Sequence, residues 1–333
     1  MILAGDIGGT KTTLALFRFR REPPGFAREA EVVVTYDSRA YGRFEAILRD
    51  FCARHRPELR AACIGIAGPV RANRCAATNL PWVVDGATLA GEVGLRKLTL
   101  LNDLEAVGYG IDVLRAEEIA VLQAGAPEAA GNRAVIAAGT GLGEAGLFWD
   151  GAAHRPFATE GGHSDFAPCD EREIALLRYL QREHGHASWE RVVSGPGLVD
   201  IYRFLRQSGE IPLGSEPPEL AAAIEGGDPG AVISRYAASG ASPLCAASLE
   251  LFVKLYAAEA GNLALKTMAT GGLYIGGGIA PKNLERMTSD TFIGSFRAKG
   301  RMRPLLEAMP VRMLLNDRCA LFGAARRAAQ DLG

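Results

Sequence analysis

The sequence predicts an α/β protein with mixed β-sheets, divided into two domains. Its 333 residues exceed the size at which a single hydrophobic core usually stops growing. Short strand patterns open the chain and then alternate with helical patterns, which is the order of an α/β fold with a mixed sheet. The same kind of pattern begins again beyond about Leu114. We therefore expect two domains with a cleft between them.

The first part of the chain reads as three strands followed by alternating helices and strands. Two apolar or alternating runs flank a Gly-Gly-Thr-Lys turn and predict a β-hairpin, with a third strand beside it. The next stretch has its apolar residues on one face of a helix and leads into a buried strand. The expected strands are Met1–Ala4, Thr12–Phe19, Glu31–Tyr36, Ala62–Ala67 and Lys97–Leu101, and the expected helices are Phe44–His55, Ala87–Val93 and Leu104–Leu114.

The second part places strands around a glycine turn and then becomes mostly helical between Glu171 and Met268. Within it, Ala246–Met268 is long and apolar, but charged residues interrupt it, so it predicts a helix packed in a protein core and not a membrane span. The expected strands are Ala134–Ala138, Ala145–Trp149, Leu273–Ile275 and Val311–Leu315, with a helix begun by Pro281 and another over Cys319–Ala329.

Composition narrows the class of protein. A hydrophobic content of 48% with 23% charged residues is typical of a globular chain, and a net charge of -1 gives no electrostatic reason to expect nucleic acid or an acidic membrane as partner. The six cysteines are scattered without a C-x-x-C pair, which argues against a zinc site and against a disulfide framework. The short stretch before Asp6 leaves no room for a signal peptide. We expect a cytoplasmic protein that binds a small molecule.

Three glycine clusters each follow a predicted strand. Without side chains at a strand end, backbone N–H groups can approach an anion closely, as a polyphosphate requires. Any one cluster could be merely a tight turn, but three at strand ends favour phosphate-binding loops. The clusters are Asp6-Ile7-Gly8-Gly9-Thr10-Lys11, Gly139-Thr140-Gly141-Leu142-Gly143 and Gly276-Gly277-Gly278.

Two common nucleotide motifs do not fit these clusters. A P-loop needs glycine where Thr10 stands, and it must be followed by a helix, whereas the next segment here is a strand. The G-x-G-x-x-G spacing of Gly141, Gly143 and Gly146 also runs directly into a strand. No helix N-terminus is then available for a pyrophosphate, so the dinucleotide-binding interpretation fails.

The D-x-G-G-T-K pattern followed by G-T-G-x-G resembles the phosphate loops of the actin-like ATPase fold, whose two domains are ribonuclease H-like. Within the hexokinase-type sugar kinases of this fold, the chain is similar to the bacterial glucokinases from Asp6 nearly to the C-terminus. The further motifs that carry this resemblance, in one order, are Leu101-Asn102-Asp103, Glu160-Gly161-Gly162-His163, Glu190-Arg191-Val192-Val193-Ser194-Gly195-Pro196-Gly197 and Gly276-Gly277-Gly278-Ile279-Ala280-Pro281.

This resemblance implies a kinase that transfers the γ-phosphoryl group of ATP to the 6-hydroxyl of glucose, with Mg²⁺ bound together with the nucleotide. The first hairpin would contact the β- and γ-phosphates and magnesium, the G-T-G loop would close over the phosphates, and the late glycine loop would lie beside the adenosine. The segment from Asp317 would pack on the first domain, giving domains of 1–113 with 315–333 and of 114–314. The implied nucleotide-binding residues are Asp6, Gly8, Gly9, Thr10, Lys11, Gly139, Thr140, Gly141, Gly277 and Gly278.

Asp103 is the candidate catalytic base. A sugar hydroxyl is a poor nucleophile, so a kinase needs a base beside it, with cations or donors around the transferring phosphoryl group. Asp103 follows a predicted buried strand and opens a predicted helix, whose dipole keeps a carboxylate ionised. The alternative is that Asn102 and Asp103 are simply a helix N-cap pair. The resemblance favours the base and also places Asn102 at the sugar.

Glu160 and His163 are the candidate ligands of the sugar hydroxyls. They are separated by two glycines, so a carboxylate and an imidazole can face one polyol and form charge-assisted hydrogen bonds. A solvated turn is the alternative. Relatives in the wider family follow this histidine with a cysteine-rich zinc motif, but here only Cys169 appears, so no structural zinc and no resident metal ligands are predicted. The resemblance adds Glu190 to the sugar ligands, and Asn79 lies in a segment that resembles a loop bordering the sugar.

Two other classes of protein stay open on the sequence. A non-catalytic sugar sensor shares this core, but such repressors carry a helix-turn-helix ahead of the first phosphate loop, and here Asp6 lies too near the start of the chain for one. A sugar-independent ATPase has no need of the Glu160 and His163 pair. The breadth of hexose specificity and the choice of phosphoryl donor are not determined. A homodimer is a reasonable expectation, because symmetric dimers are the commonest soluble oligomers.

Overall fold

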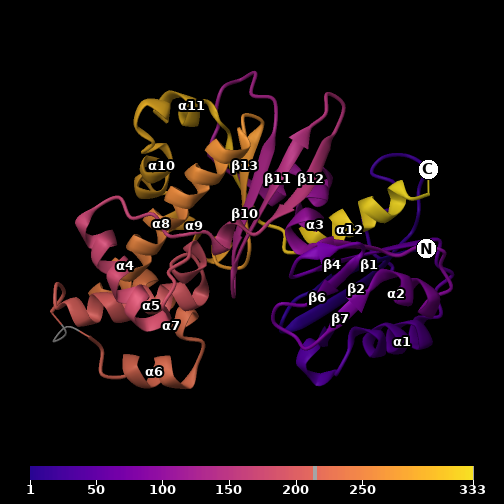
Figure 1. The fold of residues 1–333 in the computed structure, drawn as a ribbon, viewed down its shortest axis with the longest axis horizontal. Helices are drawn as coiled ribbons and strands as arrows, with labels where there is room; N and C mark the ends of the chain where they lie inside the picture. The colour runs from indigo at the N-terminus through magenta and orange to yellow at the C-terminus, as the bar shows by residue number, and fades with distance from the viewer. Residues whose placement is uncertain (213–215, 333) are drawn as a thin grey trace. The chain divides into compact units, whose positions relative to one another are not determined.

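The computed structural model describes residues 1–212 and 216–332 (Figure 1). It divides into two compact units. The first unit consists of Met1–Ile119, Ala145–Ala158 and Asn316–Gly333, and the second unit consists of Ala120–Glu144 and Thr159–Leu315. The predicted domain ranges, 1–113 with 315–333 and 114–314, stay a prediction, and the units differ from them mainly at 145–158.

The first unit is built on a five-stranded mixed sheet with the order β3-β2-β1-β4-β8. The predicted hairpin is present, because β1 and β2 pair antiparallel from Ile2↔Phe17 to Ile7↔Thr12. On its other side β1 pairs parallel with β4, and β4 pairs parallel with β8. The strands are β1 (Ile2–Ile7), β2 (Lys11–Phe17), β3 (Val32–Asp37), β4 (Ala61–Ile66) and β8 (Thr99–Asn102).

Helices cover both faces of this sheet (Figure 1). On one face lie α1 (Phe44–His55), which has the predicted bounds and buries its apolar stripe, and α2 (Gly86–Glu92). On the other face lie α3 (Asp103–Gly110) and the C-terminal α12 (Cys319–Gln330), which share a core with the sheet. The predicted helix Leu104–Leu114 is thus shorter than expected, since Ile111–Val113 forms a 3₁₀ turn.

A small three-stranded sheet in the first unit was not predicted. It has the order β5-β6-β7, with β5 at Val70–Arg71, β6 at Arg74–Ala76 and β7 at Val83–Asp85. Strands of two or three residues are too short to show a periodic pattern. This sheet leads the chain from β4 back to α2.

The second sheet has six strands in the order β12-β11-β10-β13-β14-β9. Its centre is parallel, because β10 pairs with β13 and β13 with β14 in the same direction. Four of the strands were predicted, and β9 and β12 were not. The strands are β9 (Ile119–Gln123), β10 (Arg133–Ala138), β11 (Leu142–Trp149), β12 (His154–Thr159), β13 (Gly272–Gly276) and β14 (Val311–Leu314).

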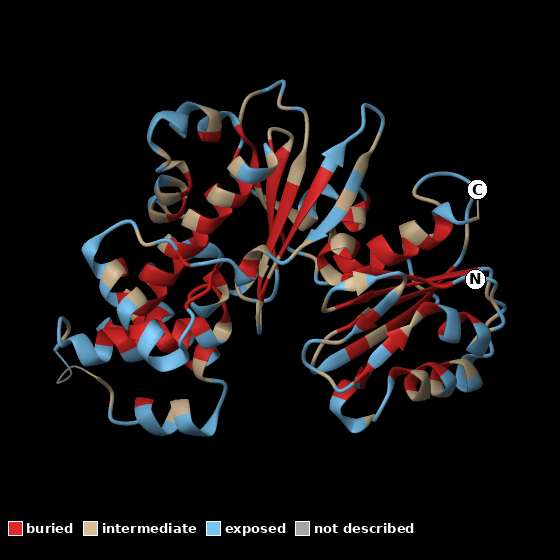
Figure 2. Cartoon of the chain, viewed as in Figure 1, coloured by how far each residue is buried: buried red, intermediate tan, exposed pale blue. Residues whose placement is uncertain are grey.

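The helices of the second unit gather around α8 (Pro243–Thr267), which is buried along most of its length (Figure 2). The predicted core helix is therefore present. The helix expected from Pro281 is instead a 3₁₀ turn, Pro281–Asn283, followed by a single turn of helix. The other helices are α4 (Glu171–His184), α5 (Gly195–Ser208), α6 (Leu220–Gly226), α7 (Pro229–Ala238), α9 (Leu284–Met287), α10 (Asp290–Arg297) and α11 (Arg303–Ala308).

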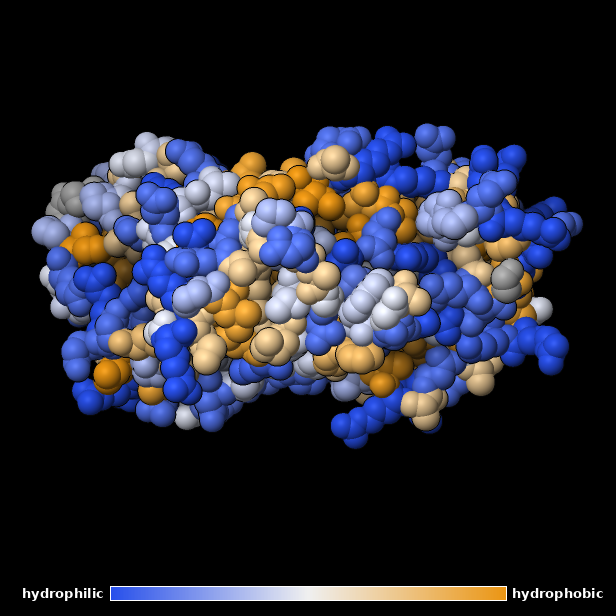
Figure 3. All heavy atoms as spheres, turned by 90° about the horizontal axis from the view of Figure 1, so that it is seen from above, coloured by the Kyte–Doolittle hydropathy of each residue, from blue (hydrophilic) through white to orange (hydrophobic). Residues whose placement is uncertain are grey.

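The surface carries both polar and apolar side chains. On the face drawn in Figure 3, charged and polar groups cover much of the surface, and apolar groups gather in patches between them. In the described part of the chain, no single helix is long and apolar enough to cross a membrane, and only α7 and α8 taken together, at a bend of 106°, have the required length and composition.

Candidate active site

The candidate base and the first phosphate loop lie at the same edge of the first unit's sheet. Strands β1, β4 and β8 are parallel, so their carboxyl ends point the same way, and open α/β sheets bind ligands at such ends. Asp6 is the penultimate residue of β1, Asn102 is the last of β8, and Asp103 is the first of α3. Between them on β4 lies Gly65, where a Cβ would be 3.1 Å from Ala106 Cβ, so α3 packs directly on the strand.

The first phosphate loop is a tight turn whose backbone is fixed by hydrogen bonds from Ser38. The Gly8 N–H donates to Lys11 O at 2.9 Å, which closes the turn. Ser38, which is fully buried, donates from Oγ to Gly8 O and from its N–H to Thr10 O, each at 2.9 Å. The predicted residues Gly8, Gly9, Thr10 and Lys11 thus form one fixed loop. Nothing in the sequence pattern singled out Ser38.

The first phosphate loop is closely packed at Gly9 and exposed at the two residues that follow. A Cβ on Gly9 would lie 2.8 Å from Asn79 Cβ, so only glycine lets the loop approach that residue. Thr10 and Lys11 are exposed and can reach a ligand. Asn79, predicted to border the sugar, therefore lies against the phosphate loop.

Asp6 suits a magnesium ion that is bound with a nucleotide. Burial raises the pKa of its carboxyl group to about 6, because loss of water disfavours the charged form. A divalent cation would favour the carboxylate, and Mg²⁺ in phosphate-transferring sites is held by one or two carboxylates together with the substrate's phosphates. Within the described residues, no group of three or more His, Cys, Asp or Glu side chains could hold a metal ion. The phosphates of the nucleotide would therefore have to supply further ligands.

Asn102 caps helix α3. Its Oδ1 accepts from Leu104 N–H at 2.9 Å, its Nδ2 donates to Gly68 O at 3.2 Å, and its own N–H donates to Glu105 Oε2 at 3.0 Å. Asn102 is therefore the N-cap of α3, and its side-chain amide is hydrogen-bonded to the backbone of Gly68 and Leu104. Asp103 follows as the first helical residue, partly exposed, with its Oδ1 3.0 Å from Leu104 N.

The second phosphate loop follows β10 in the second unit. Gly139 donates to Gly141 O at 2.9 Å, and the N–H of Gly195, the first residue of α5, donates to Gly139 O at 2.8 Å. Ser194 caps that helix by accepting from Gly197 N–H at 3.0 Å. The Gly139–Thr140–Gly141 loop thus lies directly beside a helix N-terminus, which favours anions.

The three predicted sugar ligands of the second unit form one cluster. Glu160 precedes the 3₁₀ turn Gly161–His163, and its Oε2 is 3.9 Å from His163 Nε2, while Glu190 Oε1 is 4.0 Å from His163 Nδ1. These distances exceed hydrogen-bond length, so the groups keep capacity for a ligand. Glu190 also accepts from Leu142 N–H at 2.9 Å, which ties the cluster to the second phosphate loop.

A cavity of about 820 Å³ in the second unit adjoins this loop. Gly139, Thr140 and Gly278 line it, and its size is that of a small-molecule site. Gly277 has a φ of 81°, and a Cβ there would lie 2.3 Å from Ala138 O, so the turn after β13 needs glycine. The sequence analysis assigned no role to most of the polar lining residues, because only Arg191 lay within a motif. These residues are His184, Arg191, Asp200, Arg203, Asp228, Ser234, Arg235, Lys282 and Asn283.

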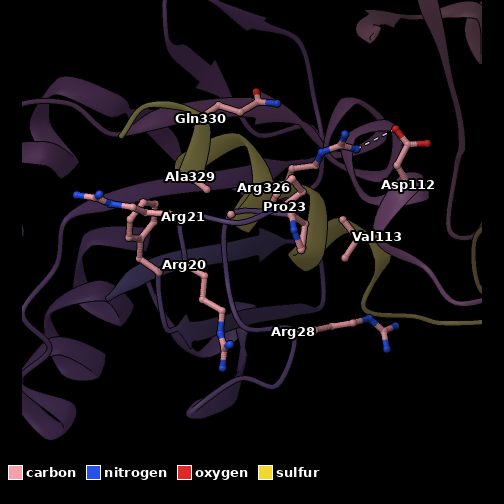
Figure 4. Close-up of a pocket in the computed structure, with 12 residues that line it drawn as sticks. Arg20, Arg21, Pro23, Arg28, Asp112, Val113, Arg326, Ala329 and Gln330 are labelled. Carbon is pink, nitrogen blue, oxygen red and sulfur yellow. Dashed lines mark hydrogen bonds and ion pairs between the residues drawn. The ribbon is translucent and has the colours of Figure 1, made fainter. Parts of the chain in front are cut away.

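A second cavity, of about 490 Å³, lies in the first unit between the segment after β2 and helix α12. Figure 4 shows its arginines directed away from one another. Arg326 pairs with Asp112 at 2.9 Å, and Arg28 pairs with Glu118. None of the predicted site residues lines this cavity, and we assign it no role.

Comparisons with known proteins show the family of the chain. A family model described as Glucokinase matches residues 3–331. A glucokinase of Nostoc sp. (strain PCC 7120) is 42% identical over 347 residues, with 99% of both chains covered. The crystal structure of a glucokinase from an Antarctic psychrotroph has 31% identity and a TM-score of 0.81, covering 99% of this chain and 98% of its own. A ROK family glucokinase from Streptomyces griseus, solved with glucose and AMPPNP, has 22% identity and a TM-score of 0.67, covers 99% of each chain, and is similar in fold.

The fold and these likenesses define a sugar kinase of the two-domain actin-like ATPase fold, as the glycine motifs predicted. The fold alone does not separate the three classes left open by the sequence, but full-length identity above 40% to a named kinase decides among them. The chain belongs to the glucokinase family. It is an ATP-dependent kinase that phosphorylates glucose.

Proposed function

We propose that the reaction takes place at the 6-hydroxyl of glucose and that Asp103 is its general base. The observation that carries this is the position of Asp103 at the edge formed by the carboxyl ends of β1, β4 and β8. Asn102 makes the helix cap, so the Asp103 carboxylate is not required for it. A carboxylate at a helix N-terminus is stabilised in its ionised form, ready to accept a proton.

The chemical step then balances as follows. The 6-hydroxyl proton passes to Asp103, the hydroxyl oxygen bonds to the γ-phosphorus, and the bond from that phosphorus to the bridging oxygen breaks. ADP leaves with the electron pair of that bond. A magnesium ion on the phosphates, beside Asp6, would neutralise the charge that develops there. The backbone N–H groups of the loop fixed by Ser38 would hold the phosphates in position.

Sugar recognition is assigned to Glu160, His163 and Glu190, with Asn102 beside the base. A carboxylate and an imidazole held about 4 Å apart present acceptors and a donor to neighbouring hydroxyls of one sugar ring. Glu190 contacts the second phosphate loop through Leu142 N–H. The same residue can therefore link sugar binding to the phosphate loop.

Nucleotide binding is assigned to the two glycine loops and to the cavity of the second unit. Asp6, Gly8, Gly9, Thr10 and Lys11 would bind the terminal phosphates of ATP. Gly139, Thr140 and Gly141 would bind them from the second loop. The 820 Å³ cavity, lined by Gly278, would take the adenosine, with Gly277 shaping the turn.

Two finer points belong to the same proposal. We expect a cytoplasmic enzyme, and we expect a homodimer, because closed two-fold assemblies are the commonest soluble oligomers. Analytical ultracentrifugation at several protein concentrations measures the assembly directly. A sedimenting species of one chain at all concentrations would contradict the dimer.

The test is Asp103→Asn, which keeps the side-chain shape but cannot take a proton. We expect kcat to fall roughly 10²–10⁴-fold, as is typical of a lost general base, with little change in the KM for glucose. Asp290→Asn is a matched control, because Asp290 is also the first residue of a helix, α10. A coupled assay of glucose 6-phosphate formation gives both constants, and a thermal melt checks folding. A folded Asp103→Asn enzyme within a few-fold of the original kcat would rule out this base.

A further inference from the structure

Two carboxyl groups are buried together in the second unit, outside the residues assigned so far. Glu144 of β11 is 2% exposed and Glu259 of α8 is 0% exposed. Their side chains are in hydrogen-bonding contact. Two buried carboxylates in contact repel strongly, so one of them keeps its proton. At neutral pH the pair therefore carries one proton and one negative charge.

The surroundings decide which group is charged. Glu259 has two donors, because Lys266 Nζ lies 3.4 Å from its Oε1 and Asn262 Nδ2 donates to its Oε2 at 2.8 Å. Within the described residues, the buried Oε1 of Glu144 has no hydrogen-bond donor. A buried carboxylate oxygen without a donor is costly, whereas a protonated carboxyl removes that cost. Glu144 is thus the protonated member.

The pKa values follow the same assignment. Burial and the charge of Glu259 raise the pKa of Glu144 to about 8, against a smaller opposing effect of Lys266. Burial raises the pKa of Glu259 as well, opposed by Asn262 and Lys266. Lys299 is a further charged group on this side and donates to Asn262 Oδ1 at 2.6 Å.

Glu144 also supports the turn that carries the proposed sugar ligands. A Cβ on Gly161 would lie 2.0 Å from Glu144 Oε2, so the turn rests directly on this side chain. Thr159 Oγ1 donates to Glu144 O at 3.0 Å and accepts from Gly161 N–H at 3.3 Å. The backbone and the side chain of Glu144 therefore both hold Gly161, which lies between Glu160 and His163.

We propose that Glu144 and Glu259, sharing one proton, are positioning residues for sugar binding that hold the Glu160–His163 turn in place. The proposal rests on the assignment of Glu160 and His163 to the sugar. The titratable groups that face the pair are Lys266 and Tyr256 of α8 and Lys299, which reaches Glu259 through Asn262. Glu160 and His163 flank Gly161 in the turn that the pair supports.

Loss of the shared proton adds a second charge beneath the turn. The two carboxylates then repel, and Glu144, which touches Gly161, moves against the turn. Only the protonated pair holds the binding-competent turn, so the apparent glucose affinity falls with the fraction of protonated pairs. The KM for glucose should then rise by up to about tenfold for each pH unit above about pH 8. The kcat should change less, because the phosphate loops and Asp103 are not part of the pair.

The experiment compares the pH dependence of glucose KM and kcat in the original enzyme, E144Q and E259Q. Glutamine has nearly the same shape as glutamate and stays neutral, so E144Q should keep its glucose KM near neutral pH and lose the alkaline rise. E259Q removes the second carboxylate, so ionised Glu144 has no charged partner to repel it, and the alkaline rise should be lost in this variant too. An unchanged alkaline rise in either variant would overturn the proposal.

Two controls keep these outcomes distinct. If E144Q does not fold, as judged by a thermal melt, the loss or persistence of the alkaline rise in E259Q still decides. E160Q tests the underlying assignment, because it should weaken glucose binding at every pH. If E160Q leaves glucose binding intact, the sugar site is wrong. If E160Q impairs binding but E144Q keeps the alkaline rise, only the role of the buried pair is wrong.

Discussion

Substitution of Gly323 by alanine should disturb the helix that begins with Asp103. In α12, a Cβ on Gly323 would lie 1.7 Å from Ala106 O of α3 and 2.7 Å from Gly110 N. Both of these are backbone atoms and cannot rotate away. An ordinary contact of about 3.5 Å requires the two helices to separate by roughly 1.5–2 Å.

The change in the free energy of unfolding follows from the closeness of this contact. Overpacking typically costs about 1–3 kcal/mol, and a clash with backbone belongs at the upper end. Replacing a glycine by alanine within a helix also stabilises the helix by about 1 kcal/mol, because alanine has the higher helix propensity. We expect a net loss of about 2 kcal/mol in the free energy of unfolding. Because a displacement of 1 Å in a catalytic group costs up to about 10²-fold in rate, kcat should fall about 10–100-fold.

Urea unfolding and the coupled glucose 6-phosphate assay measure the two effects. Gly294→Ala in α10 is the matched control, because no atom lies within 4 Å of a Cβ at that position. It should gain about 0.5–1 kcal/mol and keep its activity. If Gly323→Ala unfolds at the same urea concentration and turns over at the original rate, the contact between α12 and α3 does not position Asp103.

Two further substitutions test the ligand assignments. Glu160→Gln should weaken glucose binding by about 1.5–3 kcal/mol, the value of a charged hydrogen bond, while calorimetry should find ATP affinity unchanged; equal loss of both ligands would point to a misplaced site. Ser38→Ala removes the Oγ bond to Gly8 O and loosens the first phosphate loop, so the KM for ATP should rise by roughly fivefold or more, which corresponds to about 1 kcal/mol. A larger effect on glucose KM than on ATP KM would contradict this role of Ser38.

Much of the fold follows from local sequence patterns. The apolar stripe of Phe44–His55 predicted the bounds of α1 correctly, since the helix buries that stripe against the sheet. The strand that ends at Asn102 was predicted from its apolar run as Lys97–Leu101, and the helix that follows was predicted to begin at Leu104, one residue after its observed start at Asp103. These elements were predictable because the residues that define them are neighbours in sequence.

The features that escaped prediction depend on contacts between distant residues or on very short segments. Strands β5 to β7 are too short for a period, and the glycine-rich turn before Pro281 leads into a 3₁₀ turn where a helix was expected. Ser38 and Gly8 are 30 residues apart, and no local pattern links them. Glu144 and Glu259 meet only after β11 and α8 have packed, so a sequence shows two ordinary acidic residues.

The position of α12 along the chain has a consequence for how the protein is made. This helix supplies much of the core on one face of the first unit's sheet, including Phe322, Ala324 and Ala325. On a ribosome it is synthesised after the whole of 159–315. The part of this apolar face that α12 covers therefore stays exposed while the second unit is being translated. Folding of the first unit must finish last, and the nascent chain needs protection of that face until α12 arrives.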